Sequence, residues 1–218
     1  MCCVSSFPDT QDIVRGVRDY SYGQSRPLSF LDKFGQFLSV RQLNKGTKLL
    51  NEFQALADVG SGYSGNITKP IWKKFKIVYL FDFNLDKEKL VSTKASIKCI
   101  EGNIMQTTKS NLNPINLIVL NNVLEHVENP TLLLIQLKTN LTHEGILFIN
   151  VPSWRGKFFL EKAAFVFNLA PKEEMEDHKR YYSKRELWLE IRKAGFLPSD
   201  IKIKKSKFGL NITACVRG

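Results

Sequence analysis

Short hydrophobic runs alternate with helical patterns over most of the chain. Apolar runs of the kind that form buried strands follow residue 54 and are separated by turn residues or amphipathic stretches. They predict seven strands, over residues 55–59, 76–83, 95–103, 115–122, 145–152, 200–205 and 210–216. Helices are predicted between them, over residues 65–75, 130–141 and 184–195. Nearly continuous apolar strands separated by helices indicate a parallel sheet that is covered on both faces.

The order of these elements predicts the fold class. Right-handed crossovers between parallel strands give an α/β, doubly wound, mostly parallel seven-stranded sheet, with a ligand crevice beyond the strand C-termini. The last two strands are joined only by "SKFG", residues 206–209. A connection this short favours an antiparallel pair that closes one edge of the sheet.

The N-terminal part of the chain has a different pattern. Residues 1–26 are polar and interrupted by proline and glycine, which is typical of a loose arm. An amphipathic helix is then predicted from apolar residues spaced by three and four, at Leu28, Leu31, Phe34, Phe37 and Leu38. The stripe fades at Arg41 or Gln42, and Gly46 predicts a break before a second short helix.

Composition narrows the class of protein. The chain has 218 residues, of which 43% are hydrophobic and 24% charged, as in a soluble globular protein of ordinary domain size. No apolar run approaches the roughly 20 residues that span a bilayer, and no secretory leader is recognisable. The four cysteines lack metal-ligand spacing, so we expect a reduced, cytoplasmic setting.

The formal net charge of +11 indicates a basic surface. Lysines cluster at residues 69–76 and again at residues 202–207. Such a surface attracts nucleic acid, anionic lipid headgroups or phosphorylated substrates. Solvated lysines without a partner are the ordinary alternative, so charge alone does not assign a function.

The stretch "ALADVGSGYSGN" carries the first candidate site. Gly60, Gly62 and Gly65 follow the first strand directly, and Asp82 ends the next strand, 22 residues after Gly60. A carboxylate at that place accepts hydrogen bonds from ribose hydroxyls, so the pattern favours an adenosine derivative as ligand. Nicotinamide and flavin cofactors place a pyrophosphate at this loop. Asp58, just ahead of the glycines, suits the cationic sulfonium of S-adenosylmethionine better.

Residues 53–216 resemble the Rossmann-like (class I) S-adenosylmethionine-dependent methyltransferases. The resemblance rests on six segments in order: "DVGSGYSG", "YLFDFN", "IEGNI", "INLIVLNNVLEHVENP", "LTHEGILFINVPS" and "HKRYYSKRELWLEIRKAGF". These are most similar to the small-molecule subgroup that includes ubiquinone-pathway and sugar or lipid O-methyltransferases. The resemblance implies the Rossmann-like methyltransferase fold and S-adenosylmethionine as cofactor, with S-adenosylhomocysteine as its product.

The resemblance also implies a set of cofactor-binding residues. Asp82 is expected to hold the ribose hydroxyls, Phe83 to lie against adenine, and Asp58 to orient the amino-acid end. The family commonly has aspartate at the position of Asn103, whose amide oxygen still accepts a hydrogen bond. The whole set consists of Asp58, Gly60, Ser61, Gly62, Asp82, Phe83, Asn103, Ile104 and Asn121.

Two histidines are candidates for catalysis. His126 lies in "LEHVENP" and is expected to line the acceptor pocket, to act as a base, or to cap the following helix. His178 lies in a charged loop, where it either takes the acceptor hydroxyl proton or is a surface histidine. The ubiquinone-pathway branch binds a metal with a carboxylate at the position of Asn122. Glu125 and His126 alone are a poorer site, so no metal is predicted.

The resemblance places the acceptor between two flanking segments. Residues 153–177 are expected to form a lid that is rich in phenylalanine, and residues 1–52 to contribute an arm and helices to the same cap. A helix that packs in the core is the alternative for residues 153–177. Residues 53–218 then form the S-adenosylmethionine-binding domain. This arrangement favours an acceptor with an apolar or membrane-associated portion.

The sequence therefore predicts an S-adenosylmethionine-dependent methyltransferase for a small molecule. A lipid, quinone or glycan precursor is the expected acceptor, with O-methylation favoured. The alternatives are an RNA methyltransferase and a non-catalytic binding protein that retains the fold. Nucleic acid is the less favoured partner, and a peripheral contact with an anionic membrane is left open, as is the oligomeric state.

Overall fold

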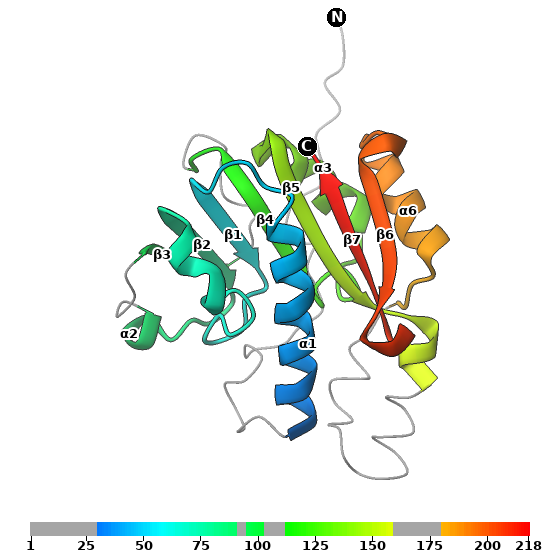
Figure 1. Cartoon of the computed structure of the whole chain (residues 1–218), viewed down its shortest axis with the longest axis horizontal. Helices are drawn as coiled ribbons and strands as arrows, with labels where there is room; N and C mark the ends of the chain where they lie inside the picture. Colours follow the sequence, from blue (N-terminus) through cyan, green and yellow to red (C-terminus); the bar gives the residue numbers. More distant parts are fainter. Residues whose placement is uncertain (1–29, 91–94, 103–111, 159–179) are drawn as a thin grey trace, which may run out of the picture.

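The computed structural model describes residues 30–90, 95–102, 112–158 and 180–218. These residues form a seven-stranded sheet of order β3-β2-β1-β4-β5-β7-β6 (Figure 1). The strands are β1 Ala55–Val59, β2 Ile77–Asp82, β3 Ser96–Glu101, β4 Ile115–Asn121, β5 Leu141–Pro152, β6 Ile201–Ser206 and β7 Asn211–Arg217. The α-helices are α1 Phe30–Thr47, α2 Lys87–Leu90, α3 Pro130–Asn140 and α6 Lys184–Lys193. The 3₁₀ helices are η2 Lys69–Lys74, η5 Pro198–Asp200 and η6 Lys207–Gly209, and residues 154–158 are also helical.

The strand directions confirm the predicted fold class. β1 pairs in parallel with both β2 and β4, and β3 and β5 continue the parallel sheet on either side. β7 runs antiparallel between β5 and β6, opposing Thr213 to Asn150 and to Lys204. The carboxyl ends of β1, β2, β4 and β5 therefore meet at one edge, where an open α/β sheet binds its ligands.

Two hydrophobic clusters cover the two faces of the sheet. α3 and α6 pack on one face, where Leu134 and Ile191 join a cluster that includes Leu120. α1 and η2 pack on the other face, where Leu43 and Trp72 join the second cluster. Figure 1 shows α1 crossing in front of the sheet, so one side of this helix faces the strands and the other faces outward.

α1 differs from the prediction in length and orientation. It is one helix to Thr47 that continues through Arg41 and Gln42, and no second helix follows in residues 48–54. The side chains of Ser39 and Leu43 are buried, whereas Phe34 and Phe37, predicted to face inward, are 44% and 61% exposed. Small residues allow the close approach: a Cβ added to Gly46 would lie 3.1 Å from the ring of Phe148 in β5.

Smaller differences occur elsewhere in the chain. Residues 69–74 form the 3₁₀ helix η2 instead of the predicted α-helix over 65–75, with Pro70 in its first turn and extended backbone at Phe75. β5 starts at Leu141, four residues before the predicted start at Gly145, and the short helix α2 was not predicted. The predicted arm over residues 1–26 lies outside the described residues.

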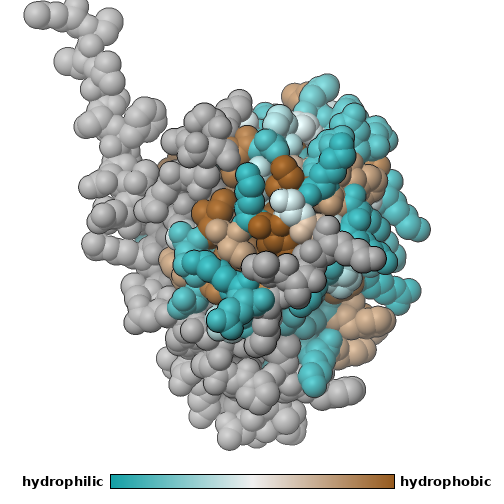
Figure 2. Space-filling model, turned by 90° about the vertical axis from the view of Figure 1, so that its left-hand side faces the viewer, coloured by the Kyte–Doolittle hydropathy of each residue, from teal (hydrophilic) through white to brown (hydrophobic). Residues whose placement is uncertain are grey.

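β3 forms one edge of the sheet. Its exposed Ser96 and Lys98 alternate with partly buried Ile97 and Cys99, as in a strand with one covered face. The view from this side shows hydrophilic and hydrophobic side chains next to one another (Figure 2). A lysine on an edge strand opposes pairing with another sheet. Among the described helices, none has the length and hydrophobicity that crossing a membrane requires.

Candidate functional site

A tight glycine turn connects β1 to the ligand-binding edge of the sheet. The backbone N–H groups of Gly60 and Ser61 both donate to the carbonyl of Phe81, at 2.8 and 3.1 Å. Gly60 has φ +70°, and a Cβ added to it would lie 2.4 Å from Cγ2 of Val123. Glycine is therefore required here on two grounds, backbone conformation and close packing. This turn holds the first loop against the ends of β2 and β4.

Asp82 faces this loop from the end of β2. Its Oδ2 accepts a hydrogen bond from the backbone N–H of Gly62 at 2.7 Å, and its Oδ1 accepts from the N–H of Phe83 at 2.8 Å. A carboxylate offers about four acceptor positions, so it can accept hydrogen bonds from several donors at once. Phe83 is 49% exposed beside it. The structure thus brings the carboxylate and the glycine loop together, and contact with ribose and adenine stays a prediction.

Asp58 lies on the inner side of the same turn. Its carboxylate is buried and accepts a 2.6 Å hydrogen bond from the hydroxyl of Thr68. Burial raises the pKa of Asp58 to about 7, the Thr68 hydrogen bond lowers it, and the charge of Asp82 raises it further. These contacts give Asp58 a structural role between β1 and η2. Its predicted contact with the amino-acid end of the cofactor stays a prediction.

Asn121 belongs to a polar network at the ends of β4 and β5. The side-chain amide of buried Asn150 donates to Oδ1 of Asn121 at 3.0 Å and to Oδ1 of Asn122 at 3.2 Å. The Thr213 hydroxyl lies 3.4 Å from Oδ1 of Asn150. Asn122 has φ +57°, a conformation that asparagine adopts more readily than most residues, and its N–H donates to the carbonyl of Asn150. The network fixes the backbone that follows β4.

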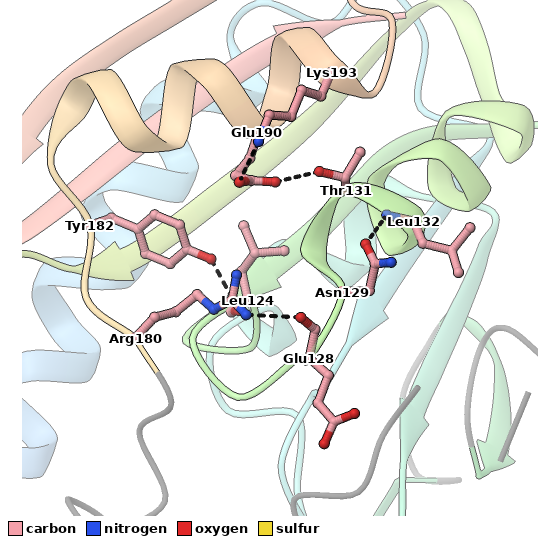
Figure 3. A network of polar contacts seen from close by, with 9 residues as sticks. All are labelled: Leu124, Glu128, Asn129, Thr131, Leu132, Arg180, Tyr182, Glu190 and Lys193. Carbon is pink, nitrogen blue, oxygen red and sulfur yellow. Dashed lines mark hydrogen bonds and ion pairs between the residues drawn. The ribbon is translucent and has the colours of Figure 1, made fainter. Parts of the chain in front are cut away.

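The "LEHVENP" loop is held from the side of α6 (Figure 3). The hydroxyl of Tyr182 donates to the carbonyl of Leu124 at 3.3 Å, and the guanidinium of Arg180 donates to the carbonyl of Glu128 at 2.8 Å. Asn129 caps α3 by accepting from the N–H of Leu132. These contacts anchor both ends of the segment that carries His126.

His126 is half-buried, and its backbone N–H donates to the carbonyl of Val123. The prediction that it caps the next helix is wrong, because the side chain of Asn129 performs that role. Its roles in lining the acceptor pocket or in taking a proton stay predictions.

Aromatic and cationic side chains meet at the end of β5. The rings of Trp154 and Tyr181 lie 5.9 Å apart, and Nζ of Lys157 lies 5.8 and 5.4 Å from their centroids. The indole N–H of Trp154 donates to Glu186, which belongs to the capping box that starts α6. Trp154 stays 51% exposed despite these contacts. Burial lowers the pKa of Lys207, in nearby η6, to about 8, and the charge of Glu125 raises it.

Several predicted site residues lie outside the described residues. These are Asn103, Ile104, His178 and the lid from residue 159 onward. Among the residues that the structure describes, no three His, Cys, Asp or Glu side chains gather as metal ligands would.

Sequence reasoning missed two residues that organise the site. Thr68 is the partner of Asp58, and nothing in its sequence context marks it. Asn150 did carry a signal, because it is a polar residue inside the otherwise apolar run "ILFINV". A buried amide in such a run needs hydrogen-bond partners, which the ends of β4 and β7 supply.

Solved structures share this fold at low sequence identity. Magnesium protoporphyrin IX methyltransferase from Synechocystis PCC 6803, with bound SAH, has a TM-score of 0.59 and 16% identity, over 90% of this chain and 91% of its own. Human N-acetylserotonin methyltransferase, in complex with SAM, has a TM-score of 0.58 and 16% identity, over 83% of this chain and 51% of its own. The small RNA methyltransferase HEN1 has a TM-score of 0.62 and 15% identity, over 89% of this chain and 27% of its own.

The chain thus spans about half the length of the human structure. No curated protein matches its sequence significantly. The sequence does match the family described as "Methyltransferase domain", over residues 30–197. The chain belongs to this family, and its resemblance to the Rossmann-like S-adenosylmethionine-dependent methyltransferases is confirmed.

Proposed function

We propose that this chain transfers a methyl group from S-adenosylmethionine to a small-molecule acceptor. The observation that carries the proposal is the position of the Asp82 carboxylate, 2.7 Å from the backbone N–H of Gly62 in the loop after β1. Family membership supports S-adenosylmethionine as the cofactor. The residues present fit it, because the Asp82 carboxylate faces a loop whose Gly60 leaves no room for a side chain.

The chain's own residues bind and orient in this proposal. Asp82 accepts hydrogen bonds from the ribose hydroxyls, and Phe83 covers the adenine. The main chain at Asn121 faces the methionine end of the cofactor. The sulfonium of the bound cofactor supplies an already activated methyl group. The remaining work of the protein is to align the acceptor atom and to exclude water. Asn150 serves this alignment by fixing the backbone after β4.

A lipid, quinone or glycan precursor with an acceptor hydroxyl is the favoured class. Exposed Trp154 and Phe158, 51% and 62% accessible, lie just beyond β5, where an acceptor would approach the methyl group. These side chains offer apolar surface, and Lys157 adds a cation for an anionic or carbonyl group. His126 is the described residue that we propose to contact the acceptor hydroxyl.

An RNA acceptor is the second candidate. It is favoured by the net charge of +11 and by the similarity in fold to HEN1. A non-catalytic binding protein is the third, and it would bind the donor without turning over any acceptor. The destination of a labelled methyl group separates the three.

Isothermal titration calorimetry with S-adenosylmethionine, S-adenosylhomocysteine and NAD tests the cofactor. Wild type should bind both adenosyl compounds, and Asp82→Ala should weaken binding by about 10- to 100-fold, as expected for loss of a charged hydrogen-bond acceptor. Asp200→Ala, which removes a carboxylate at the start of β6, is the matched control and should bind normally. Binding of NAD without a response to either adenosyl compound would overturn the proposal.

Incubation with methyl-labelled donor and separate lipid, quinone, glycan and RNA fractions then tests the acceptor. Label in one of the first three fractions supports a small-molecule methyltransferase. Label in RNA alone contradicts it, as does donor binding without transfer to any fraction.

A further inference from the structure

The outward face of α1 combines exposed aromatic and basic side chains. Phe34 and Phe37 are 44% and 61% exposed, and Lys33, Arg41 and Lys45 are exposed with them. At 3.6 residues per turn, these five positions fall within an arc of about 120°. We call this set of five residues the α1 outer face.

The opposite side of the helix packs on the sheet. Ser39, Leu43 and Gly46 are buried there, and Leu43 belongs to the hydrophobic cluster under α1. The inner side of the helix therefore contacts the sheet, whereas the two phenylalanines belong to neither hydrophobic cluster. Their exposure is an apolar surface that the fold itself does not use.

The charge of this face has one sign. Asp32 is the acidic residue of α1, and it is half-buried on the side toward the sheet. The exposed arc therefore carries three cations and no anion, in a chain whose formal net charge is +11. Figure 1 shows α1 in front of the sheet, with its other side facing outward.

We propose that the α1 outer face docks this protein on an anionic lipid bilayer. A helix that presents phenylalanines between cations can lie in the membrane interface, with its apolar side chains at the acyl boundary and its cations at the headgroups. Each lysine or arginine held near an anionic leaflet strengthens binding, and salt weakens it. The proposal does not depend on which molecule the chain methylates.

The charge and shape of the α1 outer face favour a bilayer over RNA as its partner. Phe34 and Phe37 are about one turn apart and both exposed, so they can enter a lipid surface together. Proteins that bind single-stranded RNA stack its bases on aromatic side chains along a positively charged groove. RNA binding by this face is therefore an outcome of the test that would count against the proposal.

Co-sedimentation with vesicles tests the proposal on the full chain. One set of vesicles is phosphatidylcholine alone, and the other contains about one third phosphatidylserine. Wild type should bind the anionic vesicles, lose binding at high salt, and bind neutral vesicles far more weakly. Lys33→Gln/Arg41→Gln/Lys45→Gln should weaken binding by about 100-fold, since each cation contributes roughly a factor of five. Phe34→Ser/Phe37→Ser should weaken it by at least about tenfold.

A matched control lies on α6, which covers the other face of the sheet. Lys184, Arg185 and Lys193 are exposed cations there, and Leu189 and Leu197 are exposed apolar residues of that region. The corresponding Gln and Ser variants should keep wild-type vesicle binding. Phe37→Ser alone, at the most exposed position of the α1 outer face, provides a test in case the double variant folds poorly.

Three results would overturn the proposal. The first is wild-type binding that does not depend on phosphatidylserine. The second is an equal loss of binding in the α1 and α6 variants. The third is that wild type does not bind vesicles but either shifts RNA in a gel or forms a dimer in sedimentation, and that the α1 substitutions abolish this RNA binding or dimerisation. Calorimetry with S-adenosylhomocysteine on the same variants keeps this test separate from the proposed function, because donor binding should remain unchanged.

Discussion

The hydroxyl of Thr68 donates a 2.6 Å hydrogen bond to the buried carboxylate of Asp58. Thr68 Oγ1 in turn accepts from the indole N–H of Trp72 at 2.8 Å. This chain of contacts ties the end of β1, just before the glycine turn, to η2. Because burial raises the pKa of Asp58 to about 7, the carboxyl titrates close to neutral pH.

Asp58→Asn should change how stability depends on pH. In wild type the folded pKa of about 7 lies above the ordinary value of 3.8, so the folded state binds the extra proton between these pH values. The contribution of Asp58 to the free energy of unfolding is therefore greatest below pH 3.8 and declines as pH rises through 7. Asparagine keeps an acceptor for Thr68 without the charge, so the variant should gain about 2–4 kcal/mol relative to wild type across this window.

Urea denaturation at a series of pH values measures this difference. Asp200→Asn, at the start of β6, serves as the control and should follow the wild-type curve. A constant difference between Asp58→Asn and wild type from acid to neutral pH would contradict the shifted pKa.

Gly60→Ala should destabilise the fold and weaken donor binding. The added Cβ meets Cγ2 of Val123 at 2.4 Å and the backbone has φ +70°, so both packing and conformation oppose it. A loss of about 2–4 kcal/mol is expected from strain and overpacking together. Gly35→Ala in α1 is the control, because no heavy atom lies within 4 Å of its added Cβ. That substitution should stabilise by about 0.5–1 kcal/mol in thermal melts.

Asn150→Ala should reduce affinity for S-adenosylhomocysteine. The substitution removes the amide that donates to Asn121 and Asn122, and it frees the backbone that follows β4. Asn116→Ala provides a matched control, because Asn116 Oδ1 accepts from the N–H groups of Gln54 and Ala55 at the other end of the sheet. Each variant should lose about 1–3 kcal/mol of stability.

Calorimetry should detect weaker S-adenosylhomocysteine binding in Asn150→Ala and unchanged binding in Asn116→Ala. Equal affinities in the two variants would show that Asn150 contributes only to stability.

Tyr182→Phe should cost a modest amount of stability. The lost hydroxyl leaves the carbonyl of Leu124 without the 3.3 Å hydrogen bond that it accepts in the buried interior. A decrease of about 0.5–1.5 kcal/mol is expected in chemical denaturation, with donor binding retained. Tyr63→Phe, in the loop after β1, makes the same chemical change at a half-buried position and should have a smaller effect. An unchanged denaturation midpoint for Tyr182→Phe would show that the hydrogen bond from Tyr182 to Leu124 contributes nothing to stability.

The positions of the strands followed from patterns that are local in sequence. β1 matches the predicted residues 55–59, and β2, β3, β4 and β6 match their apolar runs within two residues. Buried parallel strands are recognisable because both of their faces must be apolar. The meeting of Asp82 with the glycine loop followed from the same rule, since neighbouring parallel strands end at the same edge.

The orientation of α1 and the contacts of the "LEHVENP" loop depended on tertiary structure. Periodicity placed Phe34 and Phe37 on the inner side, but the helix packs through Ser39 and Gly46, whose small size permits close contact with β5. Tyr182 and Leu124 are 58 residues apart in sequence. No local pattern indicates such a pairing, because it arises only when α6 packs beside α3.

The position of β7 constrains the order in which the molecule can assemble. β6 is synthesised before β7, yet among the described strands it pairs with β7 alone, and β7 must also pair with β5. Until residues 211–217 are synthesised, Leu147 and Ile149 of β5 lack their pairing partners Val216 and Ala214. β6 cannot join the sheet before that point, because it pairs with β7. The sheet is therefore completed late, when β7 inserts between β5 and β6. Before this step the unpaired edge of β5 is exposed to aggregation, and chaperone binding would be most useful then.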